Sequence, residues 1–138
     1  MDEEMIKEKY MHMKMLEEQI EKVQEQVQSF DKQAQELENI KEGLEGSKSL
    51  KEDTEMLVPL SPGIFMKAKV GDTKQLIVNV GSHTAVTRTA DEATAMVDEQ
   101  IKGIGQLKEQ FTTQLNEMVE KGQEMEAEVR ILVEKHMK

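Results

Sequence analysis

A heptad repeat of apolar residues runs through both ends of this chain and limits what it can fold into. With Ile6 as position a, ten of the twelve a and d positions from Ile6 to Leu44 are apolar, and Lys9 and Lys41 are the exceptions. Mostly Glu, Gln and Lys fill the other positions, so the apolar seam is narrow. Such a seam predicts a coiled-coil helix of about 60 Å over residues 2–43, within an N-terminal segment 1–45, and this helix needs a partner helix.

A second repeat of the same kind occupies residues 90–138. Its d positions from Val97 to Leu132 are all apolar, and its a positions are apolar at three of six sites. Thr89 and Glu92 have the spacing of a capping box, which marks the start of a helix. The sequence therefore predicts a second coiled-coil helix. Glycines in its interior either let another helix approach closely or bend the helix, and these alternatives stay open; they are Gly103, Gly105 and Gly122.

Two helices of similar length and period most simply pack on each other as an antiparallel hairpin. Both chain ends would then lie at one tip. The competing arrangement is a continuous parallel dimer. It would need one uninterrupted helix, which Pro59 and Pro62 exclude because proline breaks a helix interior. We therefore expect a single domain with its connecting block at the end opposite the termini. The first helix is predicted to end at Gly43, Gly46, Ser47 and Ser49.

The connecting block, residues 56–89, is rich in β-formers. Ser61-Pro62-Gly63 predicts a turn, and residues 71–74 have the length of a hairpin loop. The lysines of the second segment alternate with its apolar residues, so we expect one apolar and one polar face. Four short strands, or two hairpins, are predicted; the segments are 57–60, 64–70, 76–80 and 84–89.

A small sheet with one apolar face and free edges is not stable alone in water, and it invites pairing with other chains. We therefore predict that the block assembles subunits by adding strands to an intersubunit sheet or barrel. The alternative is a self-contained sheet that caps the coil. The residues expected at the assembly surface are Val58, Leu60, Ile64, Met66, Val70, Leu76, Val78, Val80 and Val86.

Charge and composition exclude several classes of partner. The net charge is −10, and residues 1–44 carry 12 acidic against 6 basic side chains. Clustered basic residues, which nucleic-acid binding requires, are absent, so no nucleic acid is expected. No apolar run reaches the roughly 20 residues of a membrane span. The absence of cysteine favours a reducing compartment, and acidic residues occupy the N-terminus where a signal peptide is basic; a cytoplasmic protein is expected.

Catalytic chemistry has no support in the sequence. His12, His83 and His136 lie far apart, and no cysteine accompanies them to complete a metal site. Gly103 and Gly105 lie in a helical pattern without the Lys-Ser/Thr of a phosphate loop. We expect no enzymatic activity, no metal and no cofactor.

Three short motifs carry a resemblance to a known family. They are Val58-Pro59-Leu60 with Pro62-Gly63-Ile64, the run from Leu76 to Gly81, and Thr89 with Asp91, Glu92 and Ala93. In this region, and in the order of its elements, the chain resembles the alpha class of prefoldin subunits. The resemblance implies a hexamer of two alpha-class and four beta-class subunits, joined by a β-barrel platform from which coiled coils project. It also implies an ATP-independent chaperone that captures unfolded polypeptides and delivers them to a group II chaperonin.

Apolar residues off the seam gather near both chain ends, where that function would place client binding. Five of the eleven methionines fall within the first fifteen residues. Methionine is flexible and polarisable, so such a surface can fit many apolar shapes. Three alternatives remain: frayed helix ends tolerate any residue, the ends of the coil pack slightly wider, or the chain is a structural or tethering coiled coil. The candidate client-binding residues are Met5, Tyr10, Met11, Met15, Ile131, Leu132, Val133 and Met137.

Overall fold

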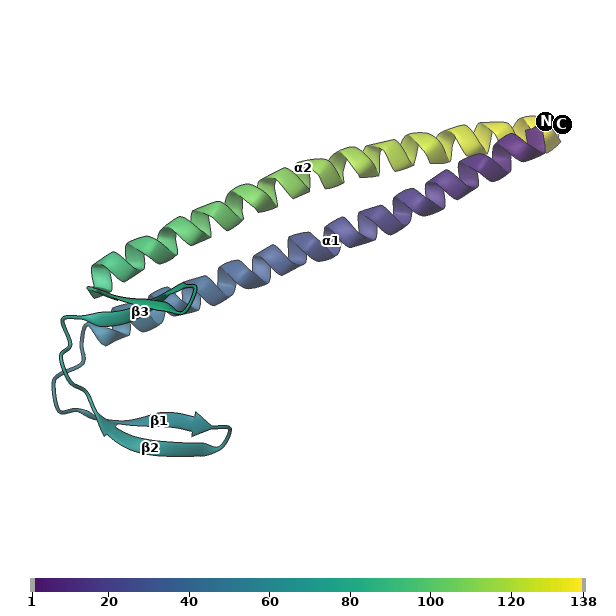
Figure 1. The fold of residues 1–138 in the computed structure, drawn as a ribbon. Helices are drawn as coiled ribbons and strands as arrows, with labels where there is room; N and C mark the ends of the chain where they lie inside the picture. Colours follow the sequence, from purple (N-terminus) through teal and green to yellow (C-terminus); the bar gives the residue numbers. More distant parts are fainter. Residues whose placement is uncertain (1, 138) are drawn as a thin grey trace. The chain divides into compact units, whose positions relative to one another are not determined.

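The computed structural model describes residues 2–137, in which two long helices flank four short strands. This confirms the predicted fold class of a coiled coil with β-hairpins. The chain divides into two compact units: the first holds the residues up to Ala34 and from Ile104 onward, and the second is Gln35–Gly103. Figure 1 shows the elements, which are α1 (Asp2–Ser47), β1 (Glu55–Ser61), β2 (Ile64–Lys69), β3 (Leu76–Gly81), β4 (Thr84–Arg88) and α2 (Ala90–Met137).

The predicted heptad register is confirmed on both helices. On α1, all twelve a and d positions are buried or half-buried, and almost every other described position is exposed. On α2, eleven of the twelve are buried or half-buried, and His136 is the exposed exception. A 3.5-residue period places these side chains along one stripe, and this stripe is the surface that each helix buries.

In the first unit the two helices run antiparallel. The rings of Phe30 and Phe111 meet edge to face, with centroids 5.1 Å apart and an interplanar angle of 88°. Phe30 is only 6% exposed, which makes it one of the few buried side chains among the described residues. Glu3 Oε1 lies 3.8 Å from His136 Nε2, so the first turns of α1 and the last turns of α2 lie side by side (Figure 1).

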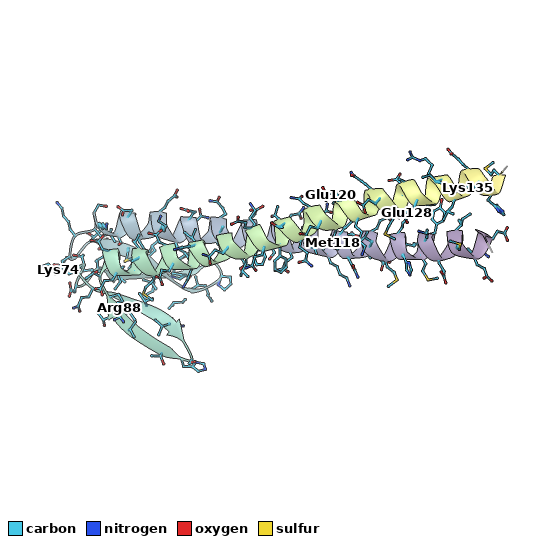
Figure 2. All side chains as sticks on the ribbon, turned by 90° about the horizontal axis from the view of Figure 1, so that it is seen from above. Lys74, Arg88, Met118, Glu120, Glu128 and Lys135 are labelled. Atoms are coloured by element: carbon cyan, nitrogen blue, oxygen red, sulfur yellow. The ribbon has the colours of Figure 1, made fainter. Side chains whose placement is uncertain are left out.

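The lysines that interrupt the apolar seam form ion pairs across it. Lys9 donates to Glu128 (labelled on α2 in Figure 2), and Lys108 Nζ lies 2.5 Å from Asp31 Oδ1. These lysines are half-buried because their aliphatic stems pack along the seam while the ammonium groups reach carboxylates at its edge.

In the second unit Lys41 makes the same kind of contact. Its Nζ lies 2.7 Å from Asp98 Oδ1, and this hydrogen bond raises the pKa of Lys41. Nearer the strands, Lys48 Nζ lies 2.6 Å from Asp91 Oδ1. The helix segments of this unit are therefore antiparallel as well.

The first helix ends one turn later than predicted. Gly43 and Gly46 lie inside α1, which continues to Ser47. Leu44, at a seam position between the two glycines, is half-buried, and its packing offsets their low helix propensity. The end is closed by side-chain hydroxyls: Ser47 Oγ donates to the Leu44 carbonyl (2.6 Å) and Ser49 Oγ to the Gly46 carbonyl (2.8 Å).

The predicted capping box at the start of α2 is confirmed. The Glu92 amide donates to Thr89 Oγ1 (3.1 Å), and the Thr89 amide donates to Glu92 Oε1 (3.2 Å). The backbone hydrogen bond from Thr89 is the main reason that the pKa of Glu92 is lowered. A carboxylate in the first turn also interacts favourably with the helix dipole.

The strands form two separate antiparallel hairpins, β1–β2 and β3–β4. The turn at Pro62-Gly63 is confirmed, with Gly63 at φ 80°. Ser82 and His83 close the second hairpin with φ values of 51° and 58°. The prediction of a hairpin loop at residues 71–74 was wrong, since this segment joins the two hairpins and its neighbours do not pair. Each two-residue turn instead pairs a strand with its immediate neighbour in sequence.

The first hairpin carries apolar side chains on both faces. On one face Val58 lies opposite Met66. On the other, Leu57 lies opposite Lys67, and Phe65 lies opposite Pro59. The prediction of one apolar and one polar face was therefore wrong for this hairpin, because the lysines of β2 share their face with Phe65.

Gly122 is the interior glycine of α2 at which the partner helix comes close. A Cβ atom at this position would lie 3.6 Å from Leu16 Cδ2 and 3.9 Å from Ile20 Cδ1, whereas Gly103 and Gly105 have open space. Both distances are ordinary van der Waals contacts. We expect Gly122→Ala to stabilise the helix pair by about 1 kcal/mol, because alanine has the higher helix propensity and also fills the gap.

Chemical denaturation followed by circular dichroism measures this effect. Gly105→Ala is the matched control, because it gains helix propensity without a new contact. A Gly122→Ala variant less stable than the parent chain would show that the seam cannot accept a methyl group there.

Candidate binding surfaces

Six of the eight candidate client-binding residues are exposed in the first unit. Their exposed fractions range from 46% for Met5 to 81% for Met137. Leu132 and Val133 are half-buried, because Leu132 is a seam residue and Val133 flanks it. Met1 lies outside the described residues. We call the exposed group the tip cluster; it consists of Met5, Tyr10, Met11, Met15, Ile131 and Met137.

The tip cluster is not an extension of the seam. Met11 and Met15 are one helical turn apart at heptad positions f and c, on the face of α1 that points away from its seam. Met5 and Tyr10 flank the seam on opposite sides, at positions g and e. Since seam packing does not use these side chains, they are available to another molecule.

A groove runs along one edge of the helix pair in the first unit. Two adjoining hollows of about 420 and 250 Å³ share His12, Lys121 and Met125. Met5 borders the larger hollow and Met15 the smaller one. We call this the methionine groove, lined by Met5, Met15 and Met125. Residues of both helices thus give it flexible apolar walls and a few charged positions.

Sequence reasoning assigned Met125 to the seam alone and did not predict the groove. The sequence feature that could have predicted the groove is Gly122. It occupies an a position one turn before Met125 and has no side chain to fill the seam. A further hollow of about 170 Å³ lies beside Gly122, with Leu16 and Val119 in its lining. A missing seam side chain leaves space between two helices, so a glycine at an a position predicts hollows in its neighbourhood.

The strands of the second unit expose most of the residues expected at an assembly surface. Val58, Leu60, Ile64, Met66 and Val80 are exposed. The others are half-buried, namely Val70, Leu76, Val78 and Val86.

Four further apolar side chains of the strands are exposed and were missed, namely Met56, Leu57, Phe65 and Ile77. Ile77 is 82% exposed. Strict alternation places Phe65 and Ile77 on the polar faces of their strands. Because both side chains are strongly hydrophobic, they could have been predicted to belong to a binding surface as well. Exposed apolar patches of this extent mark interaction sites on soluble proteins.

The three histidines are exposed, and among residues 2–137 no three metal-binding side chains come together. Within the same residues no helix combines the length and the apolar character needed to cross a bilayer.

The fold and its surfaces define a class of protein: a helix hairpin with a narrow seam, whose connection carries two exposed apolar β-hairpins. The model of the prefoldin subunit family matches residues 16–135, and the chain belongs to this family. The curated relatives that it matches are alpha-class subunits, which confirms the predicted class.

Two of these relatives are the alpha subunits of prefoldin from Thermofilum pendens and Methanopyrus kandleri. The first is 30% identical over 82 residues, which span 59% of this chain and 64% of the relative. The second is 46% identical over 55 residues, which span 40% of this chain and 35% of the relative. The matches thus cover less than two thirds of either relative.

A solved structure of a filamentous PFD from Methanocaldococcus jannaschii has the same fold. Its TM-score is 0.75 at 22% identity, and the alignment covers 83% of this chain and 95% of that one.

Proposed function

We propose that this chain is a subunit of an ATP-independent chaperone that holds unfolded polypeptides. The observation that carries the proposal is the tip cluster, six large side chains that are 46–81% exposed and have no role in the seam. An unfolded chain displays apolar side chains in no fixed arrangement. A flexible methionine-rich surface can adapt to them, whereas a rigid pocket fits one shape.

The strand hairpins support a separate role in assembly. Exposed Val58, Met66 and Ile77 leave much apolar surface in contact with water in the single chain. Among residues 2–137, neither two-stranded sheet has a third strand to pair its outer edges. We propose that other subunits cover these faces and edges in an intersubunit β-barrel, since isolated hairpins are marginal in water.

The finer part of the proposal follows family membership. The partners would be beta-class prefoldin subunits, in a hexamer of two alpha and four beta chains. Each chain would form a single domain. The complex would work in the cytoplasm and pass its clients to a group II chaperonin. These features are proposals for this chain, supported by its similarity to alpha-class subunits.

The test replaces tip-cluster side chains and measures how the assembled complex suppresses aggregation of a denatured client without nucleotide. The variant is Met5, Met11, Met15 and Met137→Gln with Ile131→Gln. Glutamine has nearly the length and helix propensity of methionine, so the helices should persist while the apolar surface is lost. We expect most of the suppression to disappear at unchanged oligomer mass.

A control variant removes equally apolar helix residues outside the tip cluster. Ile40, Leu107 and Val119 are 50%, 43% and 37% exposed, and their replacement by Gln should leave client holding intact. Full suppression by the tip variant would contradict the proposed site. A complex that assembles but holds no client in its parent form would instead favour the structural or tethering coiled coil.

A further inference from the structure

Methionine is the only sulfur-containing residue of this chain, with eleven methionines and no cysteine. Any reversible oxidation of a side-chain sulfur must therefore occur at a thioether. Oxidation of methionine depends on the access of an oxidant to the sulfur, so exposure decides which methionines react first.

The structure sorts the described methionines into groups by exposure. Met5, Met11, Met15 and Met137 of the tip cluster are 46%, 66%, 54% and 81% exposed. The seam methionines are half-buried between the helices; they are Met13, Met118 and Met125. Met96 of α2, next to the seam residue Val97, is half-buried as well. The helix pair thus holds protected methionines within a few residues of accessible ones, as with Met13 between Met11 and Met15.

The strand methionines form a third group. Met56 and Met66 are 44% and 56% exposed in the single chain. They share one face of the first hairpin, where Met56 pairs with Ala68 and Met66 with Val58. On the proposed function this face is covered by neighbouring subunits, so in the assembled complex the tip methionines are the accessible ones.

We infer that the tip methionines are a reversible oxidation site that controls client binding; this inference rests on the proposed function. The oxidant is a peroxide. With hydrogen peroxide, the thioether sulfur attacks one oxygen, and the O–O bond breaks as the S–O bond forms. The proton on the sulfur-bound oxygen passes to the leaving hydroxide, which departs as water. Sulfur loses two electrons and the peroxide gains them. The product sulfoxide is polar, so it no longer offers apolar contact to a client. An enzyme of the sulfoxide reductase class restores the thioether with two electrons from a dithiol, which becomes a disulfide while the sulfoxide oxygen leaves as water.

The site lies where oxidation changes binding without dismantling the fold. Met11 and Met15 occupy positions that seam packing does not use, so their sulfoxides leave the helix pair intact. A sulfoxide at Met13 or Met125 would instead place a polar group in the seam, where it would have to be desolvated.

The experiment treats the assembled complex with limiting hydrogen peroxide and maps sulfoxides by peptide mass spectrometry. We expect oxidation at Met5, Met11, Met15 and Met137 to be several-fold faster than at the seam and strand methionines. Client holding should fall in parallel with oxidation of the tip, at unchanged helicity and oligomer mass, and recover after treatment with methionine sulfoxide reductase.

The matched variant is Met5, Met11, Met15 and Met137→Leu, which keeps the tip apolar but removes its sulfur. We expect peroxide to leave its client holding at the level measured before treatment, because leucine is not oxidised, and each complex is compared only with its own untreated state. The inference is overturned if the variant loses activity as the parent does, or if the parent holds client equally well with its tip oxidised. A parent complex that holds no client before treatment would overturn the proposed function as well.

Discussion

Replacing Val58 and Met66 with aspartate is expected to abolish assembly of the chain with its partner subunits while leaving its helices intact. The two side chains lie opposite each other in the β1–β2 hairpin and are 39% and 56% exposed in the single chain. If other subunits bury them, the variant loses roughly 1.5–3 kcal/mol of apolar burial at each position. It must also desolvate two carboxylates that have no partner, which adds several kcal/mol. A combined loss beyond about 4 kcal/mol weakens association roughly a thousandfold or more.

Analytical ultracentrifugation with a beta-class partner measures the effect on assembly. The control places two aspartates in the connecting segments outside the strands, as Lys51→Asp and Lys74→Asp. These residues are already charged and exposed, and their substitution changes the net charge by more than the test variant does. A control that assembles would therefore exclude a general effect of added negative charge. Normal assembly of the Val58→Asp, Met66→Asp variant would contradict the proposed role of this face.

The helices could be predicted almost completely from the sequence because their pattern is local. A heptad position depends only on the residues of its own helix, and every a and d position from Ile6 to Leu44 is indeed buried or half-buried. The lysines at these positions looked like interruptions, since their partners lie on the other helix. Lys108 pairs with Asp31 and Lys41 with Asp98, contacts about 60 to 80 residues apart in sequence. No period within one helix identifies such pairs.

The same lysines explain why the chain prefers an antiparallel hairpin to a parallel dimer of identical helices. In a parallel pair in register, Lys9 and Lys41 would each face their own copy across the seam, where like charges repel. In the antiparallel pair each half-buried ammonium meets a carboxylate. The prolines exclude one continuous helix, and the seam lysines add a specific preference for the observed orientation.

The strand block was harder to predict, because pairing and coverage are not local properties. Alternation identified the strands but not which neighbours pair, and it placed Phe65 with the lysines on a polar face. In the structure Phe65 is 57% exposed. A strand whose two faces are both covered by other subunits does not need a polar face. The alternation rule therefore fails where other subunits are expected to bury the side chains of both faces.

Phe30→Ala is the substitution expected to destabilise the helix pair most. Phe30 is 6% exposed and packs edge to face on Phe111, in a seam whose residues are mostly half-buried. Truncating a buried phenylalanine costs about 3–5 kcal/mol, from lost burial and from the cavity left behind. For a domain of this size, such a loss lowers the melting temperature by roughly 10 °C or more.

Thermal unfolding followed at the helical circular dichroism band measures this loss, and Phe65→Ala is the matched control. It is the same substitution at an exposed site, so it should change the stability by less than about 1 kcal/mol.

The double variant Phe30→Ala, Phe111→Ala tests the pair itself. Because each ring loses part of its packing when the other is removed, the two costs should fall short of additivity by about 0.5–1.5 kcal/mol. Equal costs for Phe30→Ala and Phe65→Ala would mean that the aromatic contact does not hold the helices together. A larger cost at Phe30, with coupling to Phe111, would show that the strongest interaction of the first unit lies within the seam. Phe30 is about 20 residues along α1 from the tip cluster. The side chains of Met5 and Met11 would therefore stay free to bind.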